Sequence, residues 1–457
     1  MAENRFRSHF SNNGLLQKKI GRAVLSLAMP LIAAGSLSIF LELTDAFFVG
    51  RLGSEALAAV ALAGVVIFLL STIGMGLGVG TTALVARAFG EQDYLRADRV
   101  VVQSLFLGIF FSLAIGIVGY LFSPYLLRIL GAQDTVLKMA TAYLRILFAG
   151  IFTMYWTFLG SSAFQGAGDT LTPMKINGLS VILNIILDPL LIFGWLGFPR
   201  LEVVGAAIAT VFSRTIGSLL LLVLLYRGRD ALQIKGVGLR LERRTMATII
   251  RIGFPSSIQM VLRSFSATVL VKVAALFGSV VLAAYGVGGR IYSLFLLPGF
   301  GFGGAAATLM GQNLGADNSG KAEKSAWTAV RYYLFFLIFC GLVISLFATP
   351  IARVFNPNVQ FVAIAVTYFR YMSAGALFLS TGVVLSRALQ GVGDTVSPMM
   401  VTAISLYLIQ IPLAYFLALR TPMRETGLWL ATALGNFISG LLMFSIFIQG
   451  KWKERKL

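Results

Sequence analysis

The stretch Gln165-Gly-Ala-Gly-Asp-Thr-Leu-Thr-Pro-Met174 recurs 225 residues further along the chain as Gln390-Gly-Val-Gly-Asp-Thr-Val-Ser-Pro-Met399. Each copy lies between two long apolar segments. Neither copy has the Lys-Ser/Thr ending of a phosphate-binding loop, nor a strand pattern before it. We therefore interpret both copies as tight turns with Asp-Thr helix caps, and as the clearest mark of an internal duplication.

The same offset aligns the two halves of the chain on both sides of this stretch. The matching positions include Pro30 with Pro255, Gly53 with Gly278, and Gly90 with Gly315. After the fifth apolar segment the offset falls to 222, where Thr210 meets Thr432. This change predicts an outer loop that is three residues shorter in the second half.

Composition identifies a membrane protein with many spans. Of the 457 residues 58% are hydrophobic and only 12% are charged, with a mean hydropathy of +0.86, which is far from ordinary soluble domains. The alternating polarity of a membrane barrel is absent, so we expect an all-α protein. Twelve transmembrane helices are predicted, each long enough to cross a bilayer, at residues 23–49, 56–84, 100–122, 137–163, 174–197, 203–226, 247–276, 280–310, 327–349, 361–388, 399–419 and 427–449.

Six spans in each half predict two lobes with the same orientation in the membrane, related by a pseudo-two-fold axis along the membrane normal. We expect an N-lobe at residues 1–226, a cytoplasmic linker at 227–246 and a C-lobe at 247–457. Parallel repeats of this kind are a recurring design of secondary transporters, with alternating access to a site between the lobes.

The net charge of +19 reflects topology rather than nucleic-acid binding, because the basic residues gather beside the spans on one side. With the N-terminus in the cytoplasm, twenty-four Lys and Arg, beginning with Arg5 and Arg7, lie inside and nine lie outside, as the positive-inside rule requires. Both termini are therefore expected in the cytoplasm. The first apolar run is interpreted as a retained span rather than a cleaved signal.

Two carboxyl groups interrupt the first apolar run, within Ser36 to Gly50. Glu42 and Asp45 are three residues apart, so they share one face of a helix. An ionised carboxylate at mid-membrane depth costs at least about 2.5 to 3.5 kcal/mol, and it normally faces a partner, a cavity or an ion path. We therefore expect this stretch to contribute to the working site.

A second polar group lies in the fifth span, where Asn184 and Asp188 are one helical turn apart and Pro189 follows. Pro189 weakens the helix at this point. A structural interhelix hydrogen bond is the alternative to a cation or proton site. Thr210 in the sixth span is equally interpreted as a donor to this cluster or as part of a small-residue packing face.

The carboxyl groups of Asp45 and Asp188 are candidates for proton coupling, because neighbouring buried carboxyls can hold one proton between them. The offset of 225 pairs Asp45 with Leu270, Asn184 with Ile409 and Asp188 with Leu413. The polar cluster is thus predicted for the first half only. Other cations in or near the spans are interpreted as structural partners or as groups that border a cavity: Arg214, Arg263, Lys272 and Arg290. No catalytic motif is found, so an enzyme is not expected.

These features resemble the multidrug and toxic compound extrusion (MATE) transporters, and the DinF-like prokaryotic branch in particular. The resemblance covers nearly the whole chain and rests on Ala28-Met29-Pro30, Thr44-Asp45, Val49-Gly50-Arg51-Leu52-Gly53, the Gln165 to Pro173 turn and Asn184-x-x-x-Asp188-Pro189. The NorM-like branch places coupling carboxylates in the seventh and tenth spans. Here the seventh offers Gln259, and the tenth has no Asp or Glu.

The resemblance implies export of organic cations, drugs or other amphipathic compounds, driven by an ion gradient. It assigns the cation network to Asp45, Asn184, Asp188 and Thr210, and a bend of the first span to Pro30. Two residues outside the resemblance are expected as accessory residues: Glu42, from its helical spacing to Asp45, and Arg290, a cation in or near a span. The coupling ion is expected to be H⁺, with Na⁺ at Asp45, Asn184 and Asp188 as the alternative. No cofactor is expected. We expect the protein to lie in a prokaryotic inner membrane and to function as a monomer.

Two other functions remain open on sequence grounds. A flippase for an amphipathic lipid or a lipid-linked saccharide would share the two-lobe architecture. An integral-membrane enzyme or a channel is the more remote alternative.

Overall fold

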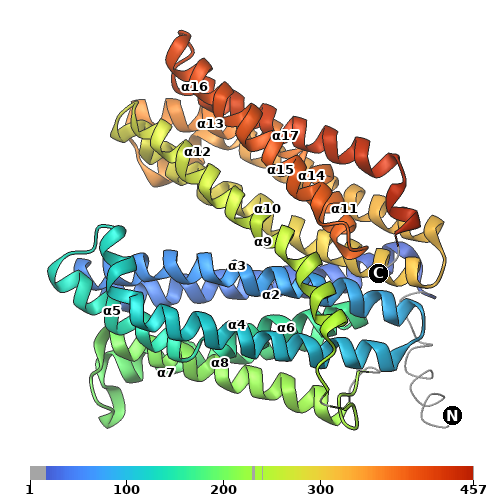
Figure 1. The fold of residues 1–457 in the computed structure, drawn as a ribbon. Coiled ribbons are helices and arrows are strands. Elements are labelled where there is room, and N and C mark those ends of the chain that lie inside the picture. The colour runs from blue at the N-terminus through green and yellow to red at the C-terminus, as the bar shows by residue number, and fades with distance from the viewer. Residues whose placement is uncertain (1–16, 229–231, 239, 456–457) are drawn as a thin grey trace. The chain divides into compact units, whose positions relative to one another are not determined.

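The computed structural model describes residues 17–228, 232–238 and 240–455. Within these ranges every regular element is a helix (Figure 1). Ten helical segments, one of them the continuous run Val396–Arg420, are long and apolar enough to cross a membrane, and two bent helix pairs bring the number of candidate spans to twelve. The all-α prediction with twelve spans is therefore confirmed. Arg5 and Arg7, part of the predicted cytoplasmic charge, lie outside the described residues.

The first six spans are formed by α2 to α8. The bounds are Ile20–Gly50 for α2, Ser54–Gly90 for α3, Tyr94–Ile129 for α4, Asp134–Ala149 for α5, Ile151–Ala167 for α6, Leu171–Phe193 for α7 and Glu202–Arg227 for α8, with the short helix η1 at Trp195–Gly197. The helices α5 and α6 form one span that is bent by 50°.

The second six spans repeat this order. The bounds are Arg243–Ala275 for α9, Ser279–Gly315 for α10, Ser319–Leu346 for α11, Ala348–Phe355 for α12, Val359–Ala376 for α13, Leu379–Gly391 for α14, Val396–Ala403 for α15, Ile404–Gln410 for η2, Ile411–Arg420 for α16, Glu425–Ile448 for α17 and Lys451–Glu454 for η3. The pair α13 and α14 is bent by 45°, at the place that matches the bend in the first half.

Both copies of the repeated Gln-Gly-x-Gly-Asp-Thr stretch are tight turns, as predicted. Gly168 and Gly393 have φ angles of 94° and 81°, values that glycine tolerates best. Asp169 Oδ1 accepts hydrogen bonds from the N–H groups of Leu171 and Thr172 at 3.0 and 2.9 Å. In the second copy, Asp394 accepts from the N–H and the hydroxyl of Ser397.

The first glycine of each turn is required by close helix packing. A methyl group on Gly166 would stand 2.9 Å from Cβ of Val85 on α3, and one on Gly391 would stand 2.6 Å from the carbonyl carbon of Ala307 on α10. Any larger residue would push α6 from α3, or α14 from α10, because packed helices leave no free volume. The motif therefore survives in both halves for reasons of packing.

The fifth span of the second half contains a π-helical turn, η2, at Ile404–Gln410. Such a turn absorbs one extra residue within a helix. Before it the offset of 225 holds, but after it the buried positions Asn184, Asp188 and Ile192 correspond to Gln410, Ala414 and Ala418 at an offset of 226. The predicted pairing of Asn184 with Ile409 and of Asp188 with Leu413 is therefore wrong by one residue.

The chain divides into two compact units. Unit 1 contains residues 33–254, and unit 2 contains residues 17–32 and 255–455 among those described. The division falls within α2, two residues after Pro30, and within α9, directly before Pro255. This division differs from the predicted lobes, residues 1–226 and 247–457, at the first helix of each lobe. The first part of α9 belongs to unit 1, and the first part of α2 belongs to unit 2.

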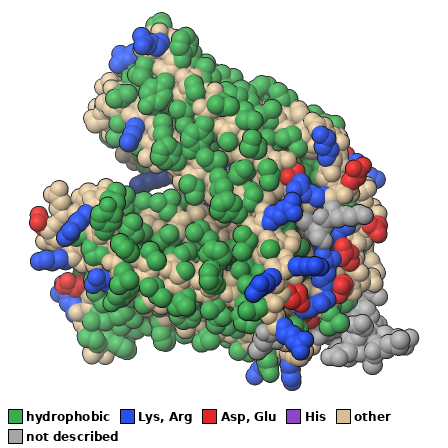
Figure 2. All heavy atoms as spheres, in the orientation of Figure 1, with side chains coloured by type: hydrophobic (Ala, Val, Ile, Leu, Met, Phe, Trp, Pro, Cys, Tyr) green, Lys and Arg blue, Asp and Glu red, His purple; other side chains and the backbone are tan. Residues whose placement is uncertain are grey.

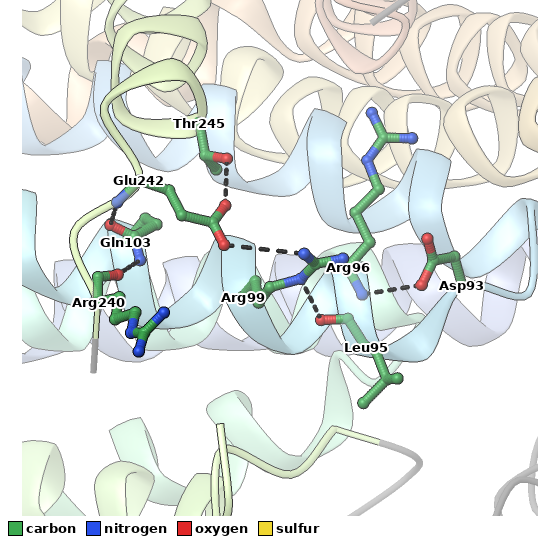
Figure 3. Close-up of polar contacts among 8 residues, drawn as sticks. All are labelled: Asp93, Leu95, Arg96, Arg99, Gln103, Arg240, Glu242 and Thr245. Atoms are coloured by element: carbon green, nitrogen blue, oxygen red, sulfur yellow. Dashed lines mark hydrogen bonds and ion pairs between the residues drawn. The ribbon is translucent and has the colours of Figure 1, made fainter. Parts of the chain in front are cut away.

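Charged side chains gather at the ends of the helices, and hydrophobic side chains cover their middle parts (Figure 2). The segment between α8 and α9 is tied to α4 within unit 1 (Figure 3). Gln103 donates to the carbonyl oxygen of Arg240 at 2.8 Å and accepts from the N–H of Glu242 at 3.0 Å. Arg99 adds an ion pair to Glu242 at 3.8 Å. The C-terminal end of the inter-lobe segment is therefore fixed to α4 by these contacts.

Candidate functional site

The candidate site lies in unit 1, where α7 and α8 approach each other closely. Gly205 on α8 lies against the backbone of α7, where a methyl group would stand 2.9 Å from the nitrogen of Ile192. This approach places Thr210 opposite Asn184 within the protein interior, with exposed fractions of 4% and 0%. The small residues that were considered as a packing face thus also bring the polar groups together.

Asn184 occupies the centre of the site. With its amide nitrogen toward the carboxyl groups, it donates to Asp45 Oδ1 at 2.9 Å and to Asp188 Oδ2 at 3.3 Å, while its oxygen accepts from the N–H of Thr210 at 3.1 Å. The opposite orientation offers only one contact, to the Thr210 hydroxyl at 3.3 Å, and it turns the amide oxygen toward carboxyl oxygens. Since the first orientation satisfies both ends of the amide, we adopt it.

The two carboxyl groups lie side by side. Asp45 and Asp188 converge on the same amide nitrogen of Asn184, and two ionised carboxylates this close repel each other, which favours a proton on one of them. Asp188 is fully buried, and its Oδ1 has no hydrogen-bond partner among the described residues. A buried oxygen without a donor is a costly group to leave ionised, so a shared proton is the simplest way to stabilise the pair.

Two contacts hold the first span against the fifth around this pair. On one side of Asp45, the amide of Asn177 on α7 donates to the carbonyl oxygen of Ala34 on α2 at 3.1 Å. On the other side, the rings of Phe48 and Phe193 pack edge to face with centroids 6.2 Å apart. The position of Asp45 is therefore fixed by polar and aromatic contacts along α2.

Three further side chains act on the site electrostatically. Arg214, one turn beyond Thr210 on α8, interacts with Asp45 and with Glu42. Tyr143 on α5 is buried and interacts with both aspartates and with Arg214. Glu42 is exposed on α2. The sequence offers Arg214 as a structural partner or as a group that borders a cavity, and it gives no sign of Tyr143, because the faces of α5 and α8 that meet the site follow only from the helix packing.

The site offers ligands for a proton or for a small cation. The carboxyl groups of Asp45 and Asp188 can take up a proton, and their oxygen atoms are also the kind of ligand that binds sodium. The Asn184 amide presents its nitrogen to the carboxyls in one orientation and its oxygen in the other, so the amide does not select the ion.

The predicted residues Asp45, Asn184, Asp188 and Thr210 are thus brought together in unit 1. Pro189 lies inside α7 directly after Asp188, and Pro30 lies inside α2. Arg290, predicted as accessory, belongs to unit 2, where its side chain is exposed.

Unit 2 retains the amide of this cluster without its acids. With the π-helical turn taken into account, Gln410 stands where Asn184 stands in unit 1, and both amides are buried. The acids are replaced by Leu270 and Ala414, with exposed fractions of 4% and 0%. The prediction that the acids occur only in the first half holds, but the amide was not lost.

Comparison with known proteins gives a consistent result. The family model described as MatE matches residues 30–190 and 255–416, once in each half. The protein described as "Probable multidrug resistance protein NorM" from Thermotoga maritima is 27% identical over 96% of this chain and 94% of its own length. A protein of Shewanella oneidensis described as an FAD transporter is 27% identical over 94% of this chain and 95% of its own length.

Solved structures of similar proteins superpose over almost the whole chain. One, described as the outward-facing conformation of a multidrug resistance MATE family transporter of the MOP superfamily, has a TM-score of 0.89 at 28% identity and covers 96% of this chain and 98% of that chain. A second, described with the words "Reverse polarity of binding pocket suggests different function of a MOP superfamily transporter from Pyrococcus furiosus", has the same TM-score and identity and covers 97% of this chain and 98% of that chain.

Proposed function

Because the chain belongs to the MatE family of transporters, we propose that it is a proton-coupled antiporter that exports amphipathic or cationic compounds across a prokaryotic inner membrane. Drug export is supported by the curated relatives, among them two described as probable multidrug resistance proteins and one described as a multidrug export protein. The multi-pass architecture follows from the twelve candidate spans.

One observation carries the choice of the coupling ion. Asp45 and Asp188 converge on the Asn184 amide, which donates to both carboxyl groups. This cluster can take up one proton and release it without rearranging its hydrogen-bond donors. The absence of an Asp or Glu from the tenth span favours a site in the N-lobe. Sodium remains the alternative ion in the proposal.

The proposed cycle uses the first span as the moving element. Protonation from the outer side neutralises the pair and releases α2 from its electrostatic attachment to Arg214 on α8. The span then bends near Pro30, where a backbone hydrogen bond is missing, and the substrate is expelled. Loss of the proton to the cytoplasm restores the attachment. We place the chain in the DinF-like branch, with both termini in the cytoplasm and the monomer as the functional unit.

Transport by the purified protein in liposomes tests this proposal. Liposomes loaded with a fluorescent amphipathic cation such as ethidium are diluted into acidic or neutral buffer, with and without a sodium gradient. We expect efflux that follows the inward pH gradient and ignores sodium. Efflux that follows sodium instead would contradict the choice of ion, and efflux indifferent to both gradients would contradict antiport.

Site variants separate the family assignment from the site assignment. Asp45→Asn and Asp188→Asn should each abolish the pH-dependent part of efflux, because an amide cannot take up the proton. Asp169→Asn, in the turn before α7, keeps its capping oxygen and serves as the matched control that retains efflux. If both site variants keep full gradient-driven efflux, coupling occurs elsewhere. A headgroup-labelled lipid that crosses the bilayer instead of ethidium would favour a flippase.

A further inference from the structure

A groove of about 650 Å³ lies on the surface of unit 1 between α4, α5 and α6. Apolar and aromatic side chains form most of its lining, among them Ile109, Leu113, Ile117, Tyr120, Phe152 and Trp156. All but Trp156 are exposed, with fractions between 40% and 61%, although they lie on helices that cross the membrane. The groove therefore opens toward lipid rather than into the packed interior of the unit.

The break between α5 and α6 shapes this groove. The two helices meet at Gly150 with a bend of 50°, and Phe148 and Ile151 on either side of the break form part of the lining. On the α4 side, the hydroxyl of Ser112 already donates to the carbonyl oxygen of Ile109 at 3.1 Å. The lining is therefore predominantly apolar.

A positive charge stands at one end of the groove. The guanidinium carbon of Arg145 on α5 lies 5.1 Å from the ring centroid of Tyr120, and its Nε donates weakly to the Tyr120 carbonyl oxygen at 3.4 Å. Within the described part of the chain no carboxylate forms an ion pair with Arg145. Its terminal amino groups are therefore available to an anion from outside the chain.

The depth of this charge matches a lipid headgroup. The 36 residues of α4 make a helix of about 54 Å, against about 30 Å of hydrocarbon, so each end extends about 12 Å beyond the hydrocarbon when the excess is shared equally. Tyr120 lies nine residues before the end of α4 at Ile129, which is about 14 Å along the axis. Tyr120 and Arg145 therefore stand near the boundary between hydrocarbon and headgroups, with the apolar groove below them.

We propose that this groove is a binding site for a phospholipid with an anionic headgroup, whose acyl chain lies along Ile117 and Phe152 while its phosphate pairs with Arg145. The planar guanidinium fits two phosphate oxygens at once. Under the proposed topology the lipid belongs to the outer leaflet. An apolar groove that ends in an unpaired cation at headgroup depth suits a molecule with one acyl part and one anionic part. A cationic drug would meet repulsion there.

The second half of the chain lacks these features, although it repeats the fold. Arg370 stands at the position that matches Arg145, but Ser345 replaces Tyr120, Ser373 replaces Phe148 and Thr381 replaces Trp156. The aromatic lining is thus confined to unit 1. This difference supplies a matched control, because Arg370 is an exposed arginine at the same repeat position.

Photolabelling tests the site without any gradient or transport, so its failure is distinct from failure of the proposed function. The purified protein is reconstituted with trace phosphatidylglycerol or phosphatidylcholine that carries a diazirine in the acyl chain, and labelled peptides are identified by mass spectrometry. We expect phosphatidylglycerol to label the peptides around Ile117 and Phe152. We expect Arg145→Gln to lower this labelling about five-fold, because the variant loses one arginine near the headgroup. Labelling should be intermediate in Arg145→Lys and unchanged in Arg370→Gln.

A second variant tests the groove itself. Ile117→Trp fills it from an exposed position, and should displace the label while the melting temperature stays unchanged. Three results would overturn the proposal: equal labelling by phosphatidylcholine, labelling spread evenly over all lipid-facing helices, or unchanged labelling in Arg145→Gln. Displacement of the phosphatidylglycerol label by ethidium would also overturn it, because it would make the groove a substrate site.

Discussion

At the scale of single residues, the acids and the amide of the site could be found from sequence, but their charge environment could not. Asp45, Asn184 and Asp188 stand out because polar groups are costly in an apolar span. The sequence indicates Arg214 without its partners and gives no sign of Tyr143, since a cation or a phenol in a span has many structural uses. Their relation to the aspartates depends on which faces of α5 and α8 meet α2 and α7.

The Asn184 amide should stabilise the site most strongly when its carboxyl partners are ionised. Replacement by leucine removes two donors from buried carboxyl groups, and each lost bond to a charged group costs about 1.5 to 3 kcal/mol. We expect Asn184→Leu to lower the melting temperature in detergent clearly at pH 8 and much less at pH 5, where the pair is protonated. A loss of stability that is equal at both pH values would show that the amide acts by packing alone.

Arg214 should set the pH range of coupling. It interacts with Asp45 and Glu42, so its positive charge favours their ionised forms. Without it the carboxyl pair holds its proton more tightly, and we expect the pH at half-maximal efflux in Arg214→Gln to move upward. Arg263→Gln is the matched control, because Arg263 also lies within a span but in unit 2. An unchanged or lower midpoint in Arg214→Gln would argue against this role.

At the scale of elements, the spans were predictable and their irregularities were not. Length and hydropathy suffice to locate α2 to α17, because each span must satisfy its own backbone in lipid. The break at Gly150 leaves the apolar pattern continuous, so the pattern predicts one span at residues 137–163 without showing its bend. The π-helical turn changes the offset between the two copies by one residue. The two sequences share too few residues in this span for the change to be seen from the sequence. That shift concealed the relation of Gln410 to Asn184.

The π-helical turn should tolerate the loss of one residue. Removal of Leu408, which is 71% exposed, shortens η2 to the length of the matching part of α7, which is α-helical throughout. We expect a destabilisation of about 1 kcal/mol or less, with Gln410 and Ala414 still buried. Removal of Ile182 from α7 is the control: no turn absorbs the loss there.

The two deletions are compared by thermal unfolding in detergent, followed by size-exclusion chromatography. Removal of Ile182 should rotate Asn184 and Asp188 by about 100° out of the site, and it should cost several kcal/mol or prevent folding. If both deletions destabilise equally, η2 is required by unit 2 rather than being an accommodated insertion.

At the scale of the whole molecule, the duplication is the feature that sequence revealed best. The family model matches once in each half, in agreement with the offset between the two Gln-Gly-x-Gly-Asp-Thr turns. The division into units within α2 and α9 was not predicted, because the repeat comparison locates equivalent segments but not their packing partners. Gly253 illustrates this: it lies on α9, yet a methyl group there would stand 2.8 Å from the carbonyl oxygen of Gly76 on α3.

The proposed orientation can be checked with the one cysteine of the chain removed. In a Cys340→Ala background, Lys235→Cys lies between α8 and α9, and Arg200→Cys lies between α7 and α8; both positions are exposed. A maleimide that cannot cross membranes should label Arg200→Cys in intact cells, and should label Lys235→Cys only after permeabilisation. The reverse pattern would invert the topology and assign the lipid groove to the inner leaflet.

The first part of α2 has a consequence for how the protein is made. Ala23, Val24, Leu27 and Ala28 are at most 2% exposed in the finished protein, and a methyl group on Gly301 of α10 would stand 3.1 Å from the carbonyl oxygen of Ala28. The partners of this segment are synthesised about 270 residues later. At a translation rate of about 5 to 20 residues per second, roughly 14 to 55 seconds pass between synthesis of the first helix and synthesis of its packing partners. During that time its buried face needs a temporary cover, either lipid or an insertion chaperone. The earliest synthesised span is therefore among the last to reach its final packing.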